Sequence, residues 1–172
     1  MADGYDGKDL VAKLGTLLPK HATVLELGMG PGKDLDMLLS RYRATGSDAS
    51  QVFVDRYLKS HPGADVLHLD AITLSTQRRF ACIYSNKVLH HLTRLDMQAS
   101  LRRQLDLLED GGIALHTLWH GDGEEEMHGL RFTYYSVQAA KDAVPEGFVA
   151  IETSVYREMK EDDSICLVLR KT

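Results

Sequence analysis

Cysteine is scarce in this sequence of 172 residues, which contains only Cys82 and Cys166. Two isolated thiols, each inside an apolar run, make neither a disulfide framework nor a metal cluster. They are typical of small core residues in a protein of a reducing compartment. The sequence therefore predicts a fold that is stabilised by packing and not by covalent cross-links.

Long hydrophobic runs are also missing. No apolar stretch approaches the length needed to cross a membrane. The opening segment Met1–Asp6 is acidic and has no apolar region of a secretion signal. We therefore expect a soluble, cytoplasmic protein without a membrane partner.

Positive charge is not concentrated anywhere along the chain. The 20 Lys and Arg residues are outnumbered by 25 Asp and Glu residues, and the formal net charge is -5. A nucleic-acid partner is disfavoured because a binder of the phosphate backbone normally carries a basic stripe. The one acidic run, Glu124–Glu126, is interpreted as a solvated surface turn. With 44% hydrophobic and 26% charged residues, the chain is predicted to form a single globular domain over residues 1–172.

Apolar strand-like segments alternate with amphipathic helical segments along the chain. Strands are predicted at residues 22–28, 44–48, 65–69, 80–84, 113–119, 147–157 and 164–170; helices are predicted at 10–18, 33–42, 52–58, 89–108 and near 134–143. Residues 120–132 are predicted to be a polar loop. This alternation predicts an α/β fold, a doubly wound and mostly parallel sheet. The last two strands, with no helix between them, predict an antiparallel hairpin at the edge.

The stretch Glu26–Gly32 says most about function. It places an acidic residue and three glycines, Gly28, Gly30 and Gly32, between the first strand and the first crossover helix. Glycine allows a positive φ and lacks the Cβ that would keep a ligand away from the backbone. The following helix offers unpaired N–H groups and a positive dipole end. The stretch predicts a site for a nucleotide-like small molecule.

Polar residues follow the next three strands as well. Asp48 ends the second strand about 20 residues after the first glycine, where a carboxylate can accept hydrogen bonds from ribose hydroxyls. Asp70-Ala71 ends the third strand, and Ser85-Asn86 follows the fourth. Capping of a helix N-terminus is the alternative role for Asp48 and for Asp70.

Two familiar nucleotide motifs do not fit the glycine stretch. A P-loop requires a different glycine spacing and a hydroxyl after its lysine, whereas Asp34 follows Lys33 here. A dinucleotide fingerprint requires a glycine at the position that Lys33 occupies. The glycine stretch therefore disfavours a nicotinamide-dependent reductase, which is kept as an alternative.

The pattern from Glu26 to Gly32, together with Asp48, Asp70-Ala71 and the stretch Val88–Leu92, resembles the class I S-adenosylmethionine-dependent methyltransferases. The sequence Val-Leu-His-His-Leu is similar to that of the branch acting on small molecules. The resemblance covers nearly the whole chain. It implies a Rossmann-like sheet of seven strands with the last strand inserted antiparallel, S-adenosylmethionine as cofactor and a small-molecule methyl acceptor.

The resemblance also implies roles for individual residues. The three glycines and Met29 would bring the backbone against the methionine part of the cofactor, and Glu26 would help to hold its amino group. The remaining cofactor-binding residues would be Asp48 and Ala49 at the ribose, Asp70 and Ala71 at the adenine, and Ser85 and Asn86 near the sulfonium. Tyr5 and the first helix would close over the cofactor.

Methyl transfer mainly requires alignment of the nucleophile, the methyl carbon and the sulfur. An oxygen or nitrogen nucleophile can also need a base. His90 and His91 are the candidate catalytic residues, and His116 and His120 are weaker ones. Histidines beside leucines are more often structural, and the histidine spacing matches no metal motif, so no metal is predicted. Trp119, Met127, Phe132, Tyr134 and Tyr135 either wall an acceptor pocket or pack against the core.

The acceptor, the atom methylated and the oligomeric state are left open by the sequence. The rival hypothesis is a non-catalytic module that binds S-adenosylmethionine or its demethylated product.

Overall fold

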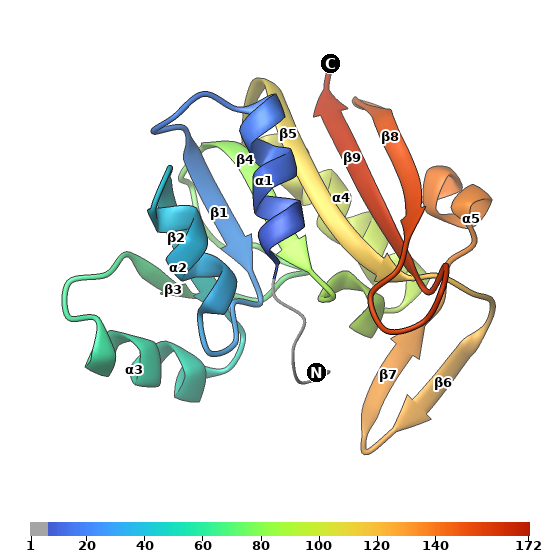
Figure 1. Ribbon diagram of the computed structural model, residues 1–172, viewed down its shortest axis with the longest axis horizontal. Coiled ribbons are helices and arrows are strands. Elements are labelled where there is room, and N and C mark those ends of the chain that lie inside the picture. The colour runs from blue at the N-terminus through green and yellow to red at the C-terminus, as the bar shows by residue number, and fades with distance from the viewer. Residues whose placement is uncertain (1–6) are drawn as a thin grey trace.

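The computed structural model describes residues 7–172, and Tyr5 lies outside them. A seven-stranded sheet runs through the molecule in the order β3-β2-β1-β4-β5-β9-β8 (Figure 1). Its strands are β1 (Thr23–Leu27), β2 (Arg43–Asp48), β3 (Val66–His68), β4 (Phe80–Asn86), β5 (Leu108–Trp119), β8 (Phe148–Tyr156) and β9 (Ser164–Lys171).

The first five strands of the sheet are parallel, and β9 is inserted antiparallel between β5 and β8. β1, β4 and β9 are buried over most of their length, as expected for strands covered on both faces. The predicted doubly wound α/β fold, with seven strands and an antiparallel hairpin at its C-terminal edge, is confirmed.

Helices cover both faces of the sheet. Residues of α1 (Lys8–Leu17), α2 (Lys33–Leu39) and α3 (Gln51–Ser60) pack with one face into a core cluster that includes Leu14, Leu38 and Tyr57. Helices α4 (Arg94–Leu107) and α5 (Val137–Asp142) pack on the other face. In Figure 1, α1 and α2 lie in front of the sheet and α4 lies behind it. The parallel strands all end at the lower edge in this view, so the loops that follow β1, β2, β3 and β4 meet there.

The segment predicted as a polar loop contains a hairpin. Strands β6 (Glu124–Met127) and β7 (Leu130–Thr133) form a separate two-stranded sheet that projects below the main sheet (Figure 1). Their connection is the two residues His128 and Gly129, with φ of 51° and 76°. A two-residue connection with both φ values positive matches the twist of antiparallel strands. Its acidic sequence concealed this hairpin, because β6 is exposed and has no buried face to produce an apolar alternation.

The long helix predicted at 89–108 is divided in two. A 3-10 turn, η1 (Leu89–His91), precedes α4, and Thr93 begins α4 by accepting a hydrogen bond from the Asp96 N–H. A hydroxyl residue at this position satisfies an N–H that the first helical turn leaves unpaired. The break turns the chain between the end of β4 and α4, so η1 lies at the lower edge of the sheet.

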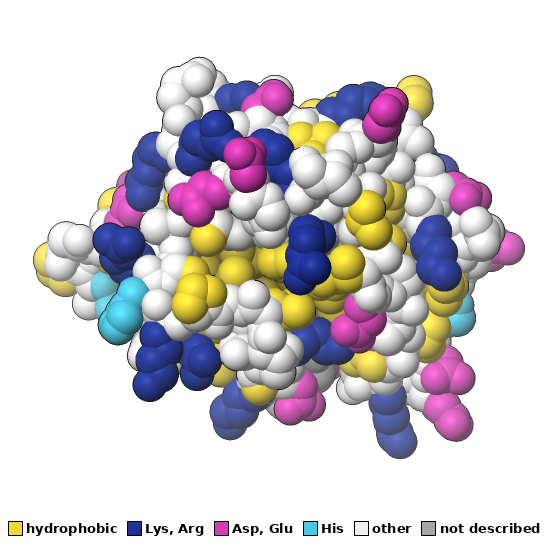
Figure 2. Space-filling view, turned by 90° about the horizontal axis from the view of Figure 1, so that it is seen from above, with side chains coloured by type: hydrophobic (Ala, Val, Ile, Leu, Met, Phe, Trp, Pro, Cys, Tyr) yellow, Lys and Arg dark blue, Asp and Glu magenta, His cyan; other side chains and the backbone are white. Residues whose placement is uncertain are grey.

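Figure 2 shows the opposite, upper end of the molecule. On this face Lys and Arg side chains alternate with acidic and apolar ones and form no continuous basic surface. Within residues 7–172, no helix has the length and apolar character required to cross a membrane.

Candidate functional site

The glycine loop after β1 has the backbone conformation that its sequence predicted. Gly28, Gly30 and Gly32 have φ values of 63°, 52° and 91°. A Cβ at Gly28 would lie 2.6 Å from a methyl carbon of Val88, and one at Gly32 would overlap the ring of Tyr57. A Cβ at Gly30 would meet nothing within 4 Å. Gly28 and Gly32 are therefore required by packing within the protein, whereas Gly30 leaves its backbone open to a ligand.

Asp48 holds this loop in place. Its Oδ2 accepts a 2.9 Å hydrogen bond from the Gly30 N–H, and its Oδ1 accepts a 2.8 Å bond from the Ser50 N–H. The residue that begins α3 is Ser50, so Asp48 is not itself the N-cap. A carboxylate has about four acceptor positions, and two hydrogen bonds leave room for ribose hydroxyls. The adjacent residue Ala49 is also at this edge, and its carbonyl oxygen lies 2.9 Å from His68 Nε2.

Met29 contributes to the loop through its backbone, because its side chain is only 4% exposed and packs in the core. Its N–H donates to the Ser47 carbonyl at 2.8 Å. Together with the bond from the Gly30 N–H to Asp48, this bond holds the glycine loop against β2 at two points. Any contact of Met29 with a cofactor would come from its main chain.

Glu26 is a buried carboxylate, 3% exposed, at the end of β1. Its Oε2 has no hydrogen-bond partner among the described residues. Burial raises the pKa of Glu26 well above its ordinary value, and the nearby carboxylates of Asp34, Asp48 and Asp36 raise it further. An unpartnered buried carboxylate beside three others favours a positively charged group.

Asp34, in the first turn of α2, was not among the residues singled out from the sequence. Its Oδ2 accepts hydrogen bonds from the Tyr84 hydroxyl at 2.6 Å and from Asn86 Nδ2 at 3.1 Å. Asn86 Oδ1 in turn accepts from the Thr117 hydroxyl. This network joins α2 to the ends of β4 and β5, and the only sequence indication was an acid in the first turn of a helix.

Asp70 and Ala71 form the turn after β3. Asp70 Oδ1 accepts hydrogen bonds from the N–H groups of Ile72 and Thr73 at 2.8 and 2.9 Å. Asp70 therefore caps a turn and not the helix considered from the sequence, because the next element along the chain is strand β4. The Ala71 N–H donates to no described residue, which leaves it available to an acceptor atom of a ligand.

Ser85 is fully buried, and its side chain does not lie at the site with Asn86. Its hydroxyl lies 2.7 Å from Nδ1 of His116 in the interior. Adjacent residues of a strand point to opposite faces of the sheet. Only the main chain of Ser85 can therefore line a cofactor, while the Asn86 side chain is placed beside Asp34.

The two candidate catalytic histidines have different surroundings. His90 is 1% exposed, and neither of its ring nitrogens has a hydrogen-bond partner among the described residues. Burial lowers its pKa to about 2, with smaller contributions from His91 and Lys87. His91 is half-buried, and its Nδ1 lies 2.8 Å from the Arg131 carbonyl on β7.

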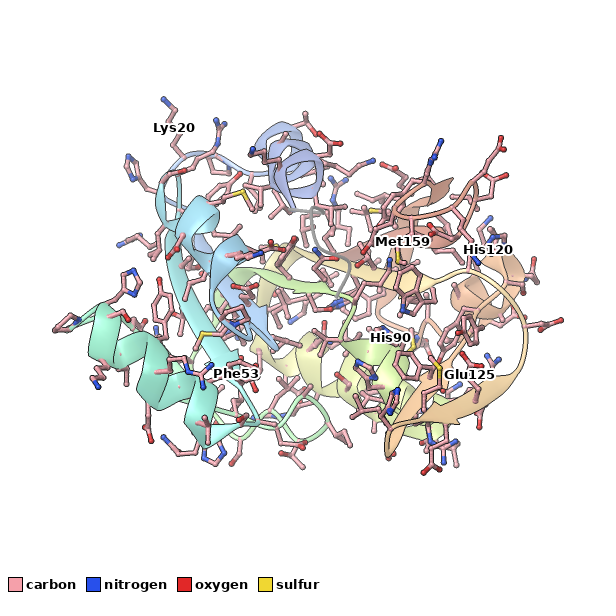
Figure 3. The ribbon with its side chains drawn as sticks, turned by 60° about the horizontal axis from the view of Figure 1, so that its bottom comes forward. Lys20, Phe53, His90, His120, Glu125 and Met159 are labelled. Carbon is pink, nitrogen blue, oxygen red and sulfur yellow. The ribbon has the colours of Figure 1, made fainter. Side chains whose placement is uncertain are left out.

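The β6–β7 hairpin lies against His90. The Phe132 ring of β7 stacks on it at a centroid distance of 5.6 Å, and Trp119 meets it edge-on at 6.2 Å. Figure 3, in which the lower edge of the sheet comes forward, shows His90 beside this hairpin and Phe53 of α3 on the other side of the edge. Of the weaker candidates, His116 lies in the interior, and His120 Nδ1 lies 2.7 Å from the Asp162 carbonyl. Across residues 7–172, no three His, Cys, Asp or Glu side chains are grouped to hold a metal ion.

Lys87 follows Asn86 and was also missed from the sequence. Its ammonium pairs with Glu158, donates to the Ser164 hydroxyl at 2.8 Å and lies 3.7 Å from the centre of the Trp119 ring. The side chains of Lys87 and Glu158 are only 11% and 9% exposed. This buried ion pair fastens the segment between β8 and β9 to the end of β4. The two residues are 71 positions apart, so no local pattern could have revealed the pair.

The strand order, with β9 inserted antiparallel, is that of the Rossmann-like methyltransferase fold. Residues 4–149 match the family model described as a methyltransferase domain. The chain belongs to this family, and the resemblance to class I methyltransferases is confirmed. No curated protein matches the chain.

Solved structures share the fold at low sequence identity. The 1,6-didemethyltoxoflavin-N1-methyltransferase of Burkholderia thailandensis is 21% identical with a TM-score of 0.81, and the match covers 99% of this chain and 80% of that one. An S-adenosylmethionine-dependent methyltransferase of Clostridium acetobutylicum is 11% identical with a TM-score of 0.80, covering 98% and 93%. The amino pentose methyltransferase CalS10 of Micromonospora echinaspora is 14% identical with a TM-score of 0.78, again covering 98% and 93%.

Proposed function

We propose that this protein transfers the methyl group of S-adenosylmethionine to a small-molecule acceptor. The observation that carries the proposal is the buried Glu26 carboxylate, with its unpartnered Oε2, beside an open Gly30 backbone. The backbone of Gly30, which has no Cβ, allows a ligand to lie close to it, and the buried carboxylate of Glu26 favours an ammonium group on that ligand. The crystal structure of the related B. thailandensis enzyme contains S-adenosylhomocysteine and its acceptor, which supports the same class of ligands here.

The residues that would hold the cofactor are those at the ends of the first four strands. Asp48 would accept the ribose hydroxyls, Asp70 and the Ala71 N–H would meet the adenine, and Glu26 would hold the amino group. Met29 and Ala49 would contribute main-chain atoms, as would Ser85, and Asn86 would contribute its side chain. The cofactor, when bound, supplies an electrophilic methyl group on a sulfonium, whose departure requires no proton.

The protein's own contribution is alignment of the acceptor with the methyl group. His90 is the candidate for contact with the acceptor: burial lowers its pKa to about 2, so its neutral ring would accept a hydrogen bond from the acceptor and not remove its proton. Its place beneath Phe132 supports a role for the β6–β7 hairpin in acceptor choice, because an acceptor would reach His90 by displacing that ring. His91 is the candidate for orienting the acceptor.

Calorimetry with S-adenosylhomocysteine, followed by a screen of metabolites with methyl-labelled S-adenosylmethionine, tests the proposal. We expect binding of the product and transfer of label to at least one small molecule. The variant His90→Leu should still bind the product but transfer more slowly, whereas His21→Asn, at the opposite end of β1, should behave as the wild type. Binding without transfer to any acceptor would favour a non-catalytic binding module. Absence of binding would overturn both interpretations.

A further inference from the structure

A chain of four buried polar side chains lies between the sheet and α4. Ser85 of β4, His116 of β5, and Ser100 and Gln104 of α4 are all 0% exposed. Ser85 Oγ lies 2.7 Å from His116 Nδ1, and His116 Nε2 lies 2.8 Å from Gln104 Oε1. Gln104 Nε2 donates to Ser100 Oγ at 3.2 Å. The chain ends where the Ser100 hydroxyl donates to the Ala71 carbonyl at 2.6 Å.

The direction of every hydrogen bond in this chain follows from its members. The pKa of His116 is lowered to about 3 by burial, so its ring is neutral and carries one N–H. Nε2 faces the carbonyl oxygen of Gln104 and must therefore be the donor. Nδ1 then accepts a hydrogen bond from the Ser85 hydroxyl. Gln104 Nε2 donates to Ser100 Oγ, and the Ser100 hydroxyl donates to the Ala71 carbonyl. Each group between Ser85 and Ala71 both donates and accepts, so the arrangement is unique.

Such a chain is not needed for stability alone. The α4 face that carries Ser100 and Gln104 otherwise buries Met97, Leu101 and Leu107, and apolar residues would fill the same space. Buried polar groups are tolerated only when they are hydrogen-bonded, and a fully satisfied set fixes one geometry. Here the fixed element is the Ala71 residue in the turn after β3. Its N–H donates to no described residue.

We propose that Ser100, held in place by Gln104, His116 and Ser85, is a positioning residue for adenine recognition. Its bond to the Ala71 carbonyl fixes the peptide unit between Ala71 and Ile72, whose N–H is held by Asp70 Oδ1, and so restrains the turn that presents the Ala71 N–H to the adenine ring. The inference rests on the proposed function, because it assumes that the adenosyl group lies at this turn. It adds a specificity-determining element that does not itself touch the ligand.

The adenine ring offers an acceptor nitrogen at N1, whereas hypoxanthine carries a hydrogen there. A correctly directed Ala71 N–H therefore favours S-adenosylhomocysteine over S-inosylhomocysteine. We expect the wild-type protein to prefer the adenine compound by at least about tenfold: one net hydrogen bond from the Ala71 N–H accounts for about that factor, and the oxygen that replaces the 6-amino group would also face Asp70. Ser100→Ala should reduce this ratio at least threefold while the affinity for the inosine compound changes little. A general loss of stability would weaken both ligands equally.

Calorimetric titration of both compounds gives the ratio, and thermal unfolding shows that each variant is folded. The matched control is Ser40→Ala, since Ser40 Oγ also donates to a carbonyl, that of Met37, but at the end of α2. Gln104→Met removes the middle of the chain at similar volume and should lower the ratio as Ser100→Ala does, which keeps the test available if one variant fails to fold. An unchanged ratio in the folded variants would overturn this inference alone, as would a wild type that does not discriminate. Failure of the wild type to bind S-adenosylhomocysteine would instead overturn the proposed function and this inference with it.

Discussion

The Gly30 N–H donates a 2.9 Å hydrogen bond to Asp48 Oδ2, so the carboxylate at the end of β2 holds the loop that follows β1. The carboxylate proposed to bind the ribose therefore also shapes the cradle for the rest of the cofactor. A single side chain with both tasks couples loop geometry to ligand affinity.

Replacement of Asp48 should reveal this coupling. Asp48→Ala removes the ribose acceptor and frees the N–H groups of Gly30 and Ser50, so we expect the dissociation constant of S-adenosylhomocysteine to rise about 100-fold. Asp48→Asn keeps one carbonyl acceptor and should lose about tenfold. The comparison is Asp55→Ala, which removes an exposed carboxylate of α3 that accepts a hydrogen bond from Gln51. Calorimetry that finds the Asp48→Ala affinity unchanged would exclude the ribose role.

Gly30 and Gly63 offer a matched pair for testing the open backbone. Both have a positive φ, 52° and 85°, and a Cβ would meet nothing within 4 Å of either. Replacement by alanine should destabilise each variant by about 1–2 kcal/mol, because the left-handed conformation disfavours a side chain. Only Gly30→Ala should also lose affinity for S-adenosylhomocysteine. Equal ligand affinity in the two variants, measured beside their urea unfolding curves, would place the cofactor elsewhere.

The conformation of the glycine loop and the alternation of strands and helices were accessible from sequence because both depend on local patterns. Three glycines between a buried strand and an amphipathic helix indicate a positive-φ loop, and Gly28, Gly30 and Gly32 adopt one. Alternating strands and helices with a final hairpin likewise imply a mostly parallel sheet with an antiparallel edge, whereas the insertion of β9 was implied only by the family resemblance. The exposed β6–β7 hairpin was missed because its strand Glu124–Met127 buries nothing that would mark it.

Side chains that depend on long-range contacts could not be predicted. Ser85 seemed to be a cofactor residue from its position after β4, yet β4 extends through Asn86, and the pleat turns the Ser85 hydroxyl inward to His116. Lys87 finds Glu158 only because β9 returns beside β5. Neither contact has a counterpart in sequence spacing.

Replacement of Glu26 should stabilise the ligand-free protein and weaken its binding of the cofactor. Its pKa is raised in the folded protein, so the folded state binds a proton more tightly than the unfolded state. The associated stability is present below the unfolded pKa, near 4.5, and is lost as the pH rises through the folded pKa. Glu26→Gln removes this loss, and we expect the ligand-free variant to melt at a higher temperature than the wild type at pH 7.5.

The same variant should bind S-adenosylmethionine more weakly, because it lacks the carboxylate proposed for the amino group. Melting curves with and without ligand at pH 5 and pH 7.5 separate the two effects. A variant that is no more stable than the wild type at pH 7.5, or that binds the ligand equally well, would contradict the role given to Glu26.

The buried pair of Lys87 and Glu158 makes a prediction about stability. Lys87→Met leaves the Glu158 carboxylate buried without its partner, and we expect a loss of about 3–5 kcal/mol in the free energy of unfolding. The double variant Lys87→Met with Glu158→Gln should recover part of that loss. For comparison, Arg131→Met breaks an ion pair with Glu124 whose side chains are 44% and 41% exposed, which should cost less than about 1 kcal/mol. Urea denaturation that gives similar losses for the two single variants would show that the Lys87 pair is not buried in solution.

His90 and His116 should make the protein sensitive to acid. Burial lowers their pKa values to about 2 and about 3 in the folded state, whereas an exposed histidine titrates near 6.5. The unfolded chain therefore binds more protons below pH 6.5. The stability that these neutral rings contribute is complete above that pH and is lost progressively as the pH falls toward the folded values.

The variant His90→Leu isolates one of these rings. It removes two nitrogens that have no partner among the described residues, so the variant should be at least as stable as the wild type at pH 7.5. Between pH 6.5 and pH 4 its melting temperature should fall less steeply, because one proton fewer is taken up on unfolding. His21→Asn, in an exposed loop before β1, should retain the steep fall, and asparagine suits the positive φ of 66° at that position. A wild-type slope in His90→Leu would mean that His90 is solvated and free to titrate, and its place beneath Phe132 would then be wrong.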